Sequence, residues 1–252
     1  MTKNLLITGG ASGIGAQTAR RAAARGYRVV VNYRSRAEQA QALVAEIARA
    51  GGHAVALPGD MAREDDIVRL FEASERALGP ISHLVNSAGI GGGNRRVEDY
   101  EAAAIADLFA TNVTGLMLCC REAAKRMSTK RGGKGGAIVN VSSMAATLGG
   151  RPGASAYAAS KGAVDSFTKA FGREVADEGI RVNSIRPGMV LTEMTEARLK
   201  DAAFRAGIEA TIPMRRVGRP EEIAEAILFL LSDEASFIAG AMLDAAGGGY
   251  VI

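Results

Sequence analysis

Residues 5–15 read LLITGGASGIG, a short apolar run that leads through a glycine-rich loop into the start of a helix. Glycine allows positive φ angles and a close approach of the backbone to a ligand. A helix N-terminus offers free N–H groups and a partial positive charge to an anion. The spacing of Gly9, Gly13 and Gly15 differs from the usual G-x-G-x-x-G. Its place after the first strand nevertheless favours a dinucleotide pyrophosphate site over a turn that binds nothing.

Outward from this loop, the chain alternates between short apolar runs and longer helical patterns. Continuous apolar runs indicate strands buried on both faces, and their alternation with helices indicates a parallel sheet. The predicted strands are residues 5–7, 29–31, 53–57, 81–86, 137–141, 180–185 and 241–245. The predicted helices are residues 13–25, 36–50, 63–78, 155–178 and 220–231, with residues 100–127 forming one long helix or two short ones.

These elements predict a doubly wound, Rossmann-type α/β fold of about seven parallel strands flanked by helices. Residues 1–252 are expected to form a single dinucleotide-binding and catalytic domain. The interval 188–219 has no clear strand and begins at a strand end. Because ligands bind beyond the carboxyl ends of such strands, we expect this interval to be a substrate-binding lid.

Composition excludes several other classes. Hydrophobic residues make up 48% of the chain and the net charge is only +4, without the clustered basic and aromatic residues of nucleic-acid-binding proteins. The basic segment Thr129–Gly136 is predicted to be a solvated loop. Cys119 and Cys120 are adjacent in an apolar stretch and are expected to be buried, reduced thiols. We find no signal peptide, no apolar run of membrane-span length and no histidine cluster for a metal, so a cytoplasmic protein is expected.

The end of the second predicted strand bears on the choice of cofactor. NAD-binding sites usually place an acidic residue there to hold the ribose hydroxyls. Residues 32–36 read NYRSR and contain no acid. Arg34 could pair with a phosphate and Ser35 could donate a hydrogen bond, which favours NADP(H) over NAD(H). The alternative is that Arg34 and Arg36 are ordinary surface charges.

An acid–base pair stands at the start of the helix predicted near residue 155. Tyr157 and Lys161 are four residues apart and share one helix face. A nearby ammonium lowers the pKa of a phenol from its ordinary value of about 10, which suits proton exchange with a carbonyl or alcohol. Ser142 and Ser143 end the fifth predicted strand, where either hydroxyl could hold a substrate oxygen. Asn112 interrupts an apolar helix and needs hydrogen-bond partners, or marks a kink.

Together these motifs resemble the short-chain dehydrogenase/reductase family over almost the whole chain. TGGASGIG at 8–15 resembles its cofactor loop, Gly59-Asp60 its adenine-contacting turn and Asn86-Ser87-Ala88-Gly89 its NNAG element. Asn112, Ser143, Tyr157 and Lys161 resemble its catalytic tetrad, and Pro187-Gly188 with Thr192 the segment that holds the nicotinamide carboxamide. The resemblance implies the cofactor-binding residues Gly9, Ser12, Gly13, Ile14, Gly15, Arg34, Ser35, Asp60, Met61, Asn86, Ala88, Gly89, Tyr157, Lys161, Pro187, Gly188, Val190 and Thr192.

The same resemblance implies the reaction. Hydride passes between the nicotinamide and a substrate carbon, while Tyr157 donates or accepts the proton and Ser143 binds the substrate oxygen. Lys161 lowers the tyrosine pKa and binds the ribose, and Asn112 anchors a water that relays protons. The favoured function is an NADP(H)-dependent oxidoreductase acting on carbonyls or secondary alcohols. The alternatives are an NAD-linked sugar or polyol dehydrogenase, which the NYRSR stretch resembles, and a catalytically silent cofactor-binding protein.

The sequence also departs from the family pattern. The interval from Ser143 to Tyr157 is one residue longer than usual, with the addition near Gly149–Gly153, so the choice between Ser142 and Ser143 stays open with Ser143 preferred. No basic residue accompanies Ser12, as it does in many NADP-dependent relatives. The expected partners are a small carbonyl or alcohol substrate, no nucleic acid and no membrane. Small residues on the Tyr157 helix, together with family habit, predict a homotetramer; these are Ala156, Ala159, Gly162 and Ala163.

Overall fold

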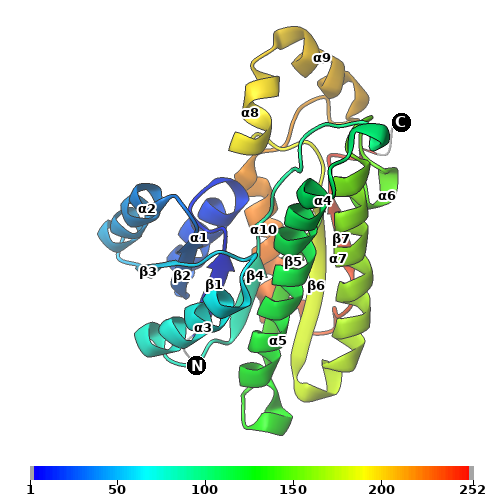
Figure 1. The fold of residues 1–252 in the computed structure, drawn as a ribbon. Coiled ribbons are helices and arrows are strands. Elements are labelled where there is room, and N and C mark those ends of the chain that lie inside the picture. The colour runs from blue at the N-terminus through cyan, green and yellow to red at the C-terminus, as the bar shows by residue number, and fades with distance from the viewer. Residues whose placement is uncertain (1–2, 250–252) are drawn as a thin grey trace.

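The computed structural model describes residues 3–249, and its centre is one seven-stranded parallel sheet in the order β3-β2-β1-β4-β5-β6-β7 (Figure 1). The strand order reverses between β1 and β4, where doubly wound sheets open a ligand crevice at their carboxyl edge. The predicted fold class is therefore confirmed. The strands are β1 (Asn4–Thr8), β2 (Arg28–Tyr33), β3 (His53–Pro58), β4 (His83–Asn86), β5 (Gly136–Val141), β6 (Ile180–Pro187) and β7 (Met242–Ala245).

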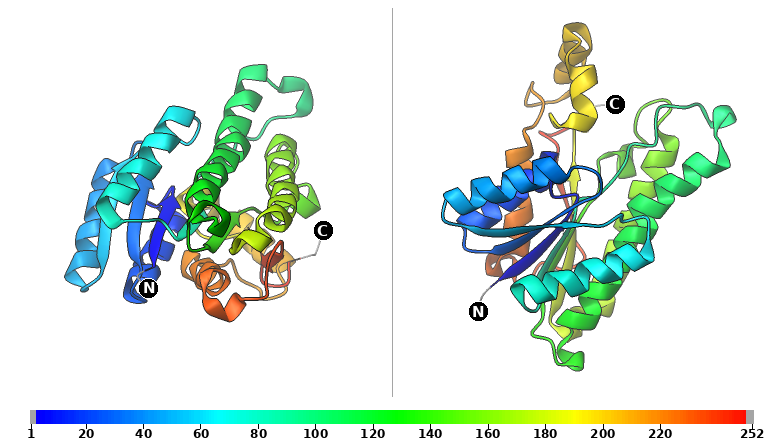
Figure 2. Two further views of the ribbon diagram at one scale, coloured as in Figure 1. Left: turned by 90° about the horizontal axis from the view of Figure 1, so that it is seen from below. Right: turned by 60° about the vertical axis from the view of Figure 1, so that its left-hand side comes forward.

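Helices cover both faces of the sheet (Figure 2). One face carries α1 (Gly13–Ala24), α2 (Ala37–Arg49) and α10 (Pro220–Leu231); the other carries α3 (Glu64–Leu78), α5 (Leu116–Met127) and α7 (Ser155–Glu174). Each face has its own hydrophobic cluster. Leu5 and Ile7 of β1 point into the first cluster and Leu6 into the second. This two-sided burial explains why the strands read as continuous apolar runs.

The stretch predicted as one long helix or two short ones is a single continuous helix with a wider turn inside it. The segments are α4 (Ala102–Phe109), a π-helical turn (Ala110–Gly115) and α5. By length and composition this helix could cross a membrane, which corrects the expectation that nothing in the chain could. It packs on the sheet in the core cluster, and core helices of globular proteins share that composition.

The interval 188–219 stands beyond the carboxyl ends of the strands, as expected, and forms α8 (Glu193–Leu199) and α9 (Ala202–Thr211) (Figure 1). Leu199, Ile212 and Val217 form a small hydrophobic cluster of its own. A parallel bridge between Val190 and Gly218 joins the two ends of the interval. The two ends of the segment therefore lie side by side where it leaves the rest of the domain. We refer to residues 188–219 as the lid.

The shorter elements complete the chain. A short helix, α6 (Ala145–Leu148), precedes α7, and 3-10 turns occupy Val97–Asp99, Thr129–Arg131, Ala176–Glu178 and Asp233–Ala235. The basic segment 129–136 is largely exposed, and Lys130 pairs with Asp177 at 2.6 Å. Cys119 and Cys120 are free and buried as expected. Burial raises the pKa of the Cys119 thiol well above its ordinary value and that of Cys120 to about 12, so both thiols are unreactive.

Candidate active site

The glycine-rich loop after β1 is packed so tightly that side chains cannot replace its glycines. Gly9 has φ of 63°, and a Cβ there would lie 2.8 Å from the Cα of Ala88. A Cβ on Gly15 would lie 2.4 Å from the carbonyl oxygen of Gly9. Gly13 has φ of 51° and opens α1 directly after Ser12. The loop thus presents bare backbone and a helix N-terminus, with Ile14 in the first turn, at the carboxyl edge of the sheet.

Asn32 holds this loop in place, and the sequence analysis gave it no role. Its side-chain oxygen accepts a hydrogen bond from the Gly9 N–H at 3.2 Å, and its carbonyl accepts one from the Gly10 N–H at 2.8 Å. Its amide donates to the Gly59 carbonyl at 3.1 Å, so one side chain joins two ligand loops. The available signal was a polar residue inside the apolar run of β2, because buried amides require partners.

The loop after β2 carries the residues expected to select the cofactor. Arg34 and Ser35 are exposed, and in residues 3–249 no carboxylate pairs with Arg34. Arg36 is different, because its guanidinium forms an ion pair with Glu193 of the lid. An unpaired arginine at this position is free to meet a phosphate.

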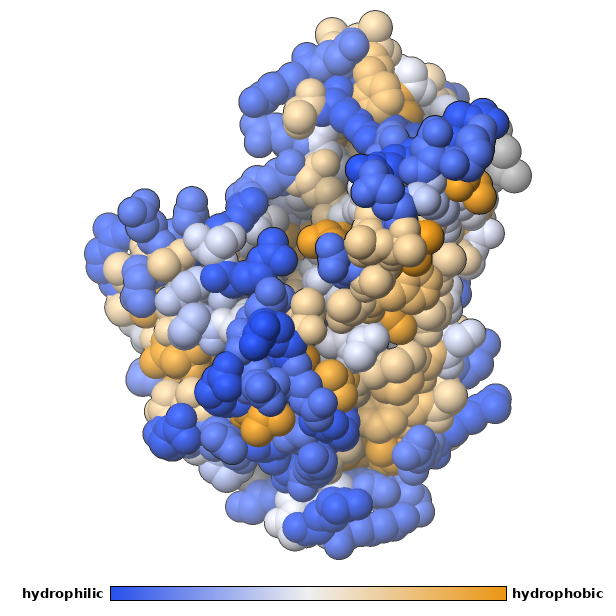
Figure 3. Space-filling model, viewed as in Figure 1, coloured by the Kyte–Doolittle hydropathy of each residue, from blue (hydrophilic) through white to orange (hydrophobic). Residues whose placement is uncertain are grey.

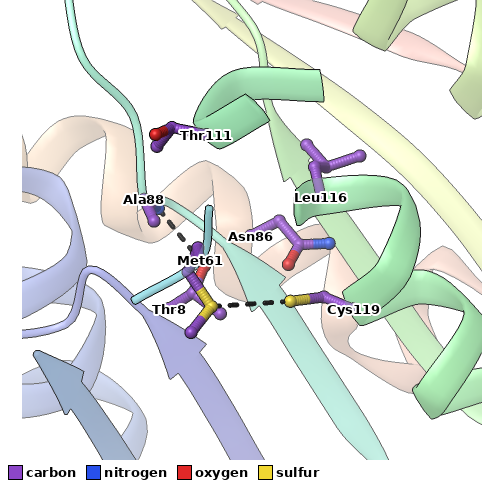
Figure 4. Close-up of a pocket in the computed structure, with 7 residues that line it drawn as sticks. All are labelled: Thr8, Met61, Asn86, Ala88, Thr111, Leu116 and Cys119. Carbon is purple, nitrogen blue, oxygen red and sulfur yellow. Dashed lines mark hydrogen bonds between the residues drawn. The ribbon is translucent and has the colours of Figure 1, made fainter. Parts of the chain in front are cut away.

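The turn after β3 brings Asp60 and Met61 to the same edge. Asp60 accepts a hydrogen bond from the Ala62 N–H at 2.9 Å, and Asp66 accepts one from the Asp60 N–H. Met61 is buried with its sulfur 3.6 Å from that of Cys119 (Figure 4). Its carbonyl packs on the long helix at Gly115, where a Cβ would lie only 1.8 Å from it.

The end of β4 is joined to β1 through Thr8. The Thr8 hydroxyl accepts hydrogen bonds from the N–H groups of Ser87 and Ala88, both at 3.2 Å. The side chain of Asn86 is 2% exposed and donates to Asn140 at 2.9 Å. Its amide therefore braces β4 against β5 and lines a small internal pocket (Figure 4). Its side-chain oxygen has no hydrogen-bond partner among the described residues, and the expectation that Asn86 binds the cofactor stays a prediction.

Ser143 and Tyr157 lie beside each other, which separates the two candidate serines. Burial raises the pKa of Tyr157 above 10, and the Ser143 hydroxyl opposes that rise. Ser143 also accepts a hydrogen bond from the Ala145 N–H at 3.1 Å. Ser142, in contrast, is buried and donates to the Lys161 carbonyl at 3.2 Å. Ser143 is thus the serine that faces the phenol.

Lys161 lies one helical turn after Tyr157, with its Nζ 5.7 Å from the centre of the tyrosine ring. The ammonium donates to the Val141 carbonyl at 2.8 Å. Burial lowers the pKa of Lys161 to about 8, and the negative charge of Asp165 opposes this. In this arrangement burial is the dominant influence on the pKa of Tyr157, and the expected lowering by Lys161 is not seen.

Asn112 occupies the π-helical turn, a feature that often marks functional positions. Its side chain exchanges two hydrogen bonds with the main chain of Ile90, at 2.9 and 3.0 Å, and donates to Ser160 at 3.2 Å. A Cβ on Gly89 would lie 3.4 Å from the Asn112 oxygen and 3.6 Å from the Lys161 Nζ. Asn112, Gly89 and Lys161 therefore meet above the end of β4.

The segment that leads from β6 into the lid closes the other side. Pro187 ends β6, and Gly188 packs so closely that a Cβ would lie 2.9 Å from Ala246. Val190 is buried, and Thr192 begins α8 with a capping box to Thr195. The Thr192 methyl lies 3.5 Å from where a Cβ of Gly13 would stand. The base of the lid thus touches the glycine-rich loop.

These features fit a dinucleotide. The glycines of the loop have no side chains that would keep its backbone away from a pyrophosphate. The N-terminus of α1 points toward the same place. Arg34 stands unpaired at the end of β2, and the pair Ser143 and Tyr157 stands at the end of β5. Among residues 3–249, no group of three or more histidines, cysteines or acidic residues is arranged to hold a metal. His83 is buried, with its ring edge-on to Tyr27.

Comparison with known proteins also indicates an oxidoreductase. A family model described as enoyl-(acyl carrier protein) reductase matches residues 9–250. The uncharacterized oxidoreductase YgfF of Escherichia coli K12 is 47% identical over 243 residues, or 96% of this chain and 98% of that protein. The 3-oxoacyl-[acyl-carrier-protein] reductase FabG of Staphylococcus aureus is 36% identical over 100% of this chain and 99% of its own length. A solved short chain dehydrogenase/reductase family protein superposes with a TM-score of 0.86 at 39% identity, covering 99% of this chain and 98% of the other.

Proposed function

We propose, from the premise that the chain belongs to the short-chain dehydrogenase/reductase family, that it transfers hydride between NADP(H) and a carbonyl or secondary alcohol, with Tyr157 as general acid and base. As a family member, the chain is an NAD(P)-dependent oxidoreductase acting on CH–OH groups. The observation that supports the role of Tyr157 most directly is that the Ser143 hydroxyl is near enough to the phenol to oppose the rise in its pKa. Both hydroxyls then bear on one substrate oxygen.

Residues of this chain would hold the dinucleotide at both ends. The main chain of Gly9–Gly15 with Ser12 would bind the pyrophosphate, Asp60 and Met61 the adenine, and Ala88 and Gly89 the ribose side. Pro187, Gly188, Val190 and Thr192 would hold the carboxamide. When bound, the nicotinamide supplies or accepts the hydride. The raised pKa keeps the Tyr157 phenol protonated, which suits proton donation to a carbonyl oxygen as it is reduced.

Lys161 and Asn112 complete the proposal. The Lys161 ammonium, 5.7 Å from the centre of the Tyr157 ring, would favour the phenolate when an alcohol is oxidised. Asn112, held by its hydrogen bonds to Ile90 and Ser160, would anchor a water that relays protons to Lys161.

Replacing Tyr157 by Phe tests the function. We expect a panel of ketones, sugars and acyl thioesters, followed by the absorbance of reduced nicotinamide, to identify a substrate of the wild-type protein. Tyr157→Phe should lower kcat by roughly 100-fold to 10,000-fold, because the proton donor is lost, while NADPH binding by fluorescence changes little. Arg20→Gln, on the far side of α1, is the control. Equal turnover by Tyr157→Phe would contradict the proposal and favour the catalytically silent alternative.

Arg34 is the residue on which the cofactor preference depends. Arg34→Asp places a carboxylate where a 2′-phosphate would lie and where ribose hydroxyls can be bound. We expect NADPH to bind about tenfold or more weaker, as for loss of a charged hydrogen bond, and NADH to bind no worse. Titration of both cofactors against Arg34→Asp and wild type measures this. If NADPH binding is unchanged, the NADP assignment is wrong and the NAD-linked sugar or polyol dehydrogenase becomes the better proposal.

We further propose a single catalytic domain with 188–219 as the substrate lid; residues 1–2 and 250–252 lie outside the described part of that domain. A homotetramer is supported by the open face of α7, where Ala159 is exposed and a Cβ on Gly162 would meet nothing within 4 Å. The free, buried thiols suit a cytoplasmic protein.

A further inference from the structure

Three segments outside the catalytic residues meet at the mouth of the site. The loop after α6 contains Arg151, six residues before Tyr157. The Arg151 guanidinium lies 4.8 Å from the ring centre of Phe204, on α9 of the lid. In the same loop, the Gly153 carbonyl accepts a hydrogen bond from the Arg95 N–H at 3.0 Å. The loop at 149–153, which is one residue longer than usual, therefore meets the lid and the 90–96 segment around Arg151.

Arg151 is half-buried and has no acidic partner. In the described part of the chain no ion pair joins it to a carboxylate. Burial lowers the pKa of Arg151, and the positive charge of Arg198 on α8 lowers it further. Arg198 is itself exposed and has no carboxylate partner among the described residues. An anion bound by both guanidinium groups would relieve the repulsion that Arg198 exerts on Arg151.

The lid contains acidic residues, but each is engaged elsewhere. The four acids of the lid bind as follows: Glu193 pairs with Arg36, Glu196 with Lys200 and Glu209 with Arg205, while Asp201 accepts the N–H groups of Ala203 and Phe204 at the start of α9. No acid of the lid therefore forms an ion pair with Arg151 or Arg198 in the described residues. Hydrophilic residues gather at this end of the molecule around α8 and α9 (Figure 3).

Exposed apolar side chains occur on the same segments as the two arginines. Leu148 and Leu191 are each 40% exposed and Met194 is 57% exposed. The Met194 sulfur lies 3.9 Å from where a Cβ of Gly91 would stand, so α8 also covers the 90–96 segment. A substrate that fills this mouth would contact apolar groups along its body and arginines at its end.

We propose that Arg151 and Arg198 form an anion subsite that selects carbonyl substrates with a carboxylate or phosphate group remote from the reacting carbon. The inference rests on the proposed function and names the substrate class of that site. A guanidinium binds such oxyanions through two parallel N–H donors. Phe204 holds the plane of Arg151 from one side, which lowers the ordering cost of binding. Arg151 is thus a specificity-determining residue, separate from the proton-transfer residues.

Matched substrates test the subsite. Levulinate is compared with methyl levulinate, and acetoacetyl-coenzyme A with the neutral acetoacetyl-N-acetylcysteamine, each by kcat/KM with the preferred cofactor. We expect the wild-type protein to prefer the charged member of at least one pair by about tenfold or more. Preference in the first pair identifies a carboxylate, and preference in the second identifies a phosphate.

Variants assign that preference to the arginines. Arg151→Gln should reduce the charged-to-neutral ratio about tenfold, as for loss of one charge-assisted hydrogen bond. Arg151→Lys should restore part of it, and Arg198→Gln should reduce it less because Arg198 is more exposed. Phe204→Leu removes the ring but keeps the charge and should raise KM for the charged substrate only. Arg20→Gln is the matched control on the far side of α1 and should leave the ratio unchanged.

The failure of this inference differs from failure of the proposed function. If neutral and charged substrates are turned over equally well, or if Arg151→Gln leaves the ratio unchanged, the anion subsite is wrong while the oxidoreductase proposal stands. If no carbonyl is reduced with either cofactor, calorimetric titration of the wild-type protein and Arg151→Gln with glutarate tests whether the anion subsite exists. Binding that is lost in Arg151→Gln supports the subsite without turnover, and binding that is absent or insensitive to Arg151→Gln overturns it.

Discussion

Lys161 is a charged residue in a buried position. Its side chain is buried, its ammonium is bound to the Val141 carbonyl, and Asp165 one turn later is committed to Arg186 at 2.7 Å and to Ser184 at 3.1 Å. Proteins bury a lysine in this way mostly where its chemistry is used. The position therefore lowers folding stability, and the lowered pKa measures that cost.

The pKa of Lys161 predicts a pH dependence of stability. In the folded protein it is about 8, against 10.5 for an exposed lysine. Between these values the unfolded chain keeps a proton that the folded chain has lost, so the folded state gains stability as pH rises through this window. Each pKa unit is worth about 1.4 kcal/mol, so we expect a gain of a few kcal/mol.

Urea unfolding of the cofactor-free protein against Lys161→Met measures this gain. The wild-type free energy of unfolding should rise relative to that of the variant as pH increases across the window. Lys169→Met removes an exposed lysine from the same helix and serves as the control. A wild-type curve parallel to that of Lys161→Met would mean that the amine is not desolvated.

At the scale of elements, the helices and strands were predictable because each buries a periodic apolar face. The helix predicted at 220–231 is α10 as observed, with Pro220 at its first position and Glu222 binding the N–H before it. The predicted strand 180–185 continues to Pro187, since a strand may end on a residue that lacks an N–H. The local sequence pattern was sufficient to predict an element wherever tertiary packing favoured the same structure.

Where packing decides, the sequence alone left alternatives. Nothing in residues 100–127 shows that two helical segments continue through a π-helical turn, because that turn is set by contacts of Asn112 with Ile90 and Ser160. The choice between Ser142 and Ser143 depends on which hydroxyl the end of β5 turns toward Tyr157. The sequence did not indicate the hydrogen bond from Asn86 to Asn140, because a buried amide on a strand looks the same whether it binds a ligand or a neighbouring strand.

The common location of the predicted site residues could be foreseen because the fold brings strand ends together. Ser143 follows β5, residues 86–89 begin at the last residue of β4, and the glycine loop follows β1, so all three meet at one edge of the sheet. Arg151 and Phe204 could not be paired in advance, because they come from a loop and a lid whose contact no periodicity encodes. Residues on ordered strands are thus placed by topology, and those on loops only by the structure.

The whole molecule leaves one face of its helical layer uncovered. A broad apolar surface extends over α7 and the neighbouring α5 (Figure 3). On α7 the exposed Ala159 and the open position of Gly162 give a smooth strip on which another helix could pack closely. Exposed apolar faces of this kind usually mark protein–protein contacts. A second copy of the chain, placed symmetrically, would bury it.

Gly162→Arg tests whether that face joins subunits. A side chain at this position meets nothing within 4 Å in the monomer, so the substitution should leave the fold intact and add helix propensity. In an assembly it would place a charge in the contact, and we expect the tetramer mass, measured by light scattering during gel filtration, to fall to that of a dimer or monomer. Ala48→Arg adds the same charge on exposed α2 and should leave the mass unchanged. A Gly162→Arg protein that keeps the wild-type tetramer mass would show that α7 lies outside the interface, and a monomeric wild type would remove the tetramer altogether.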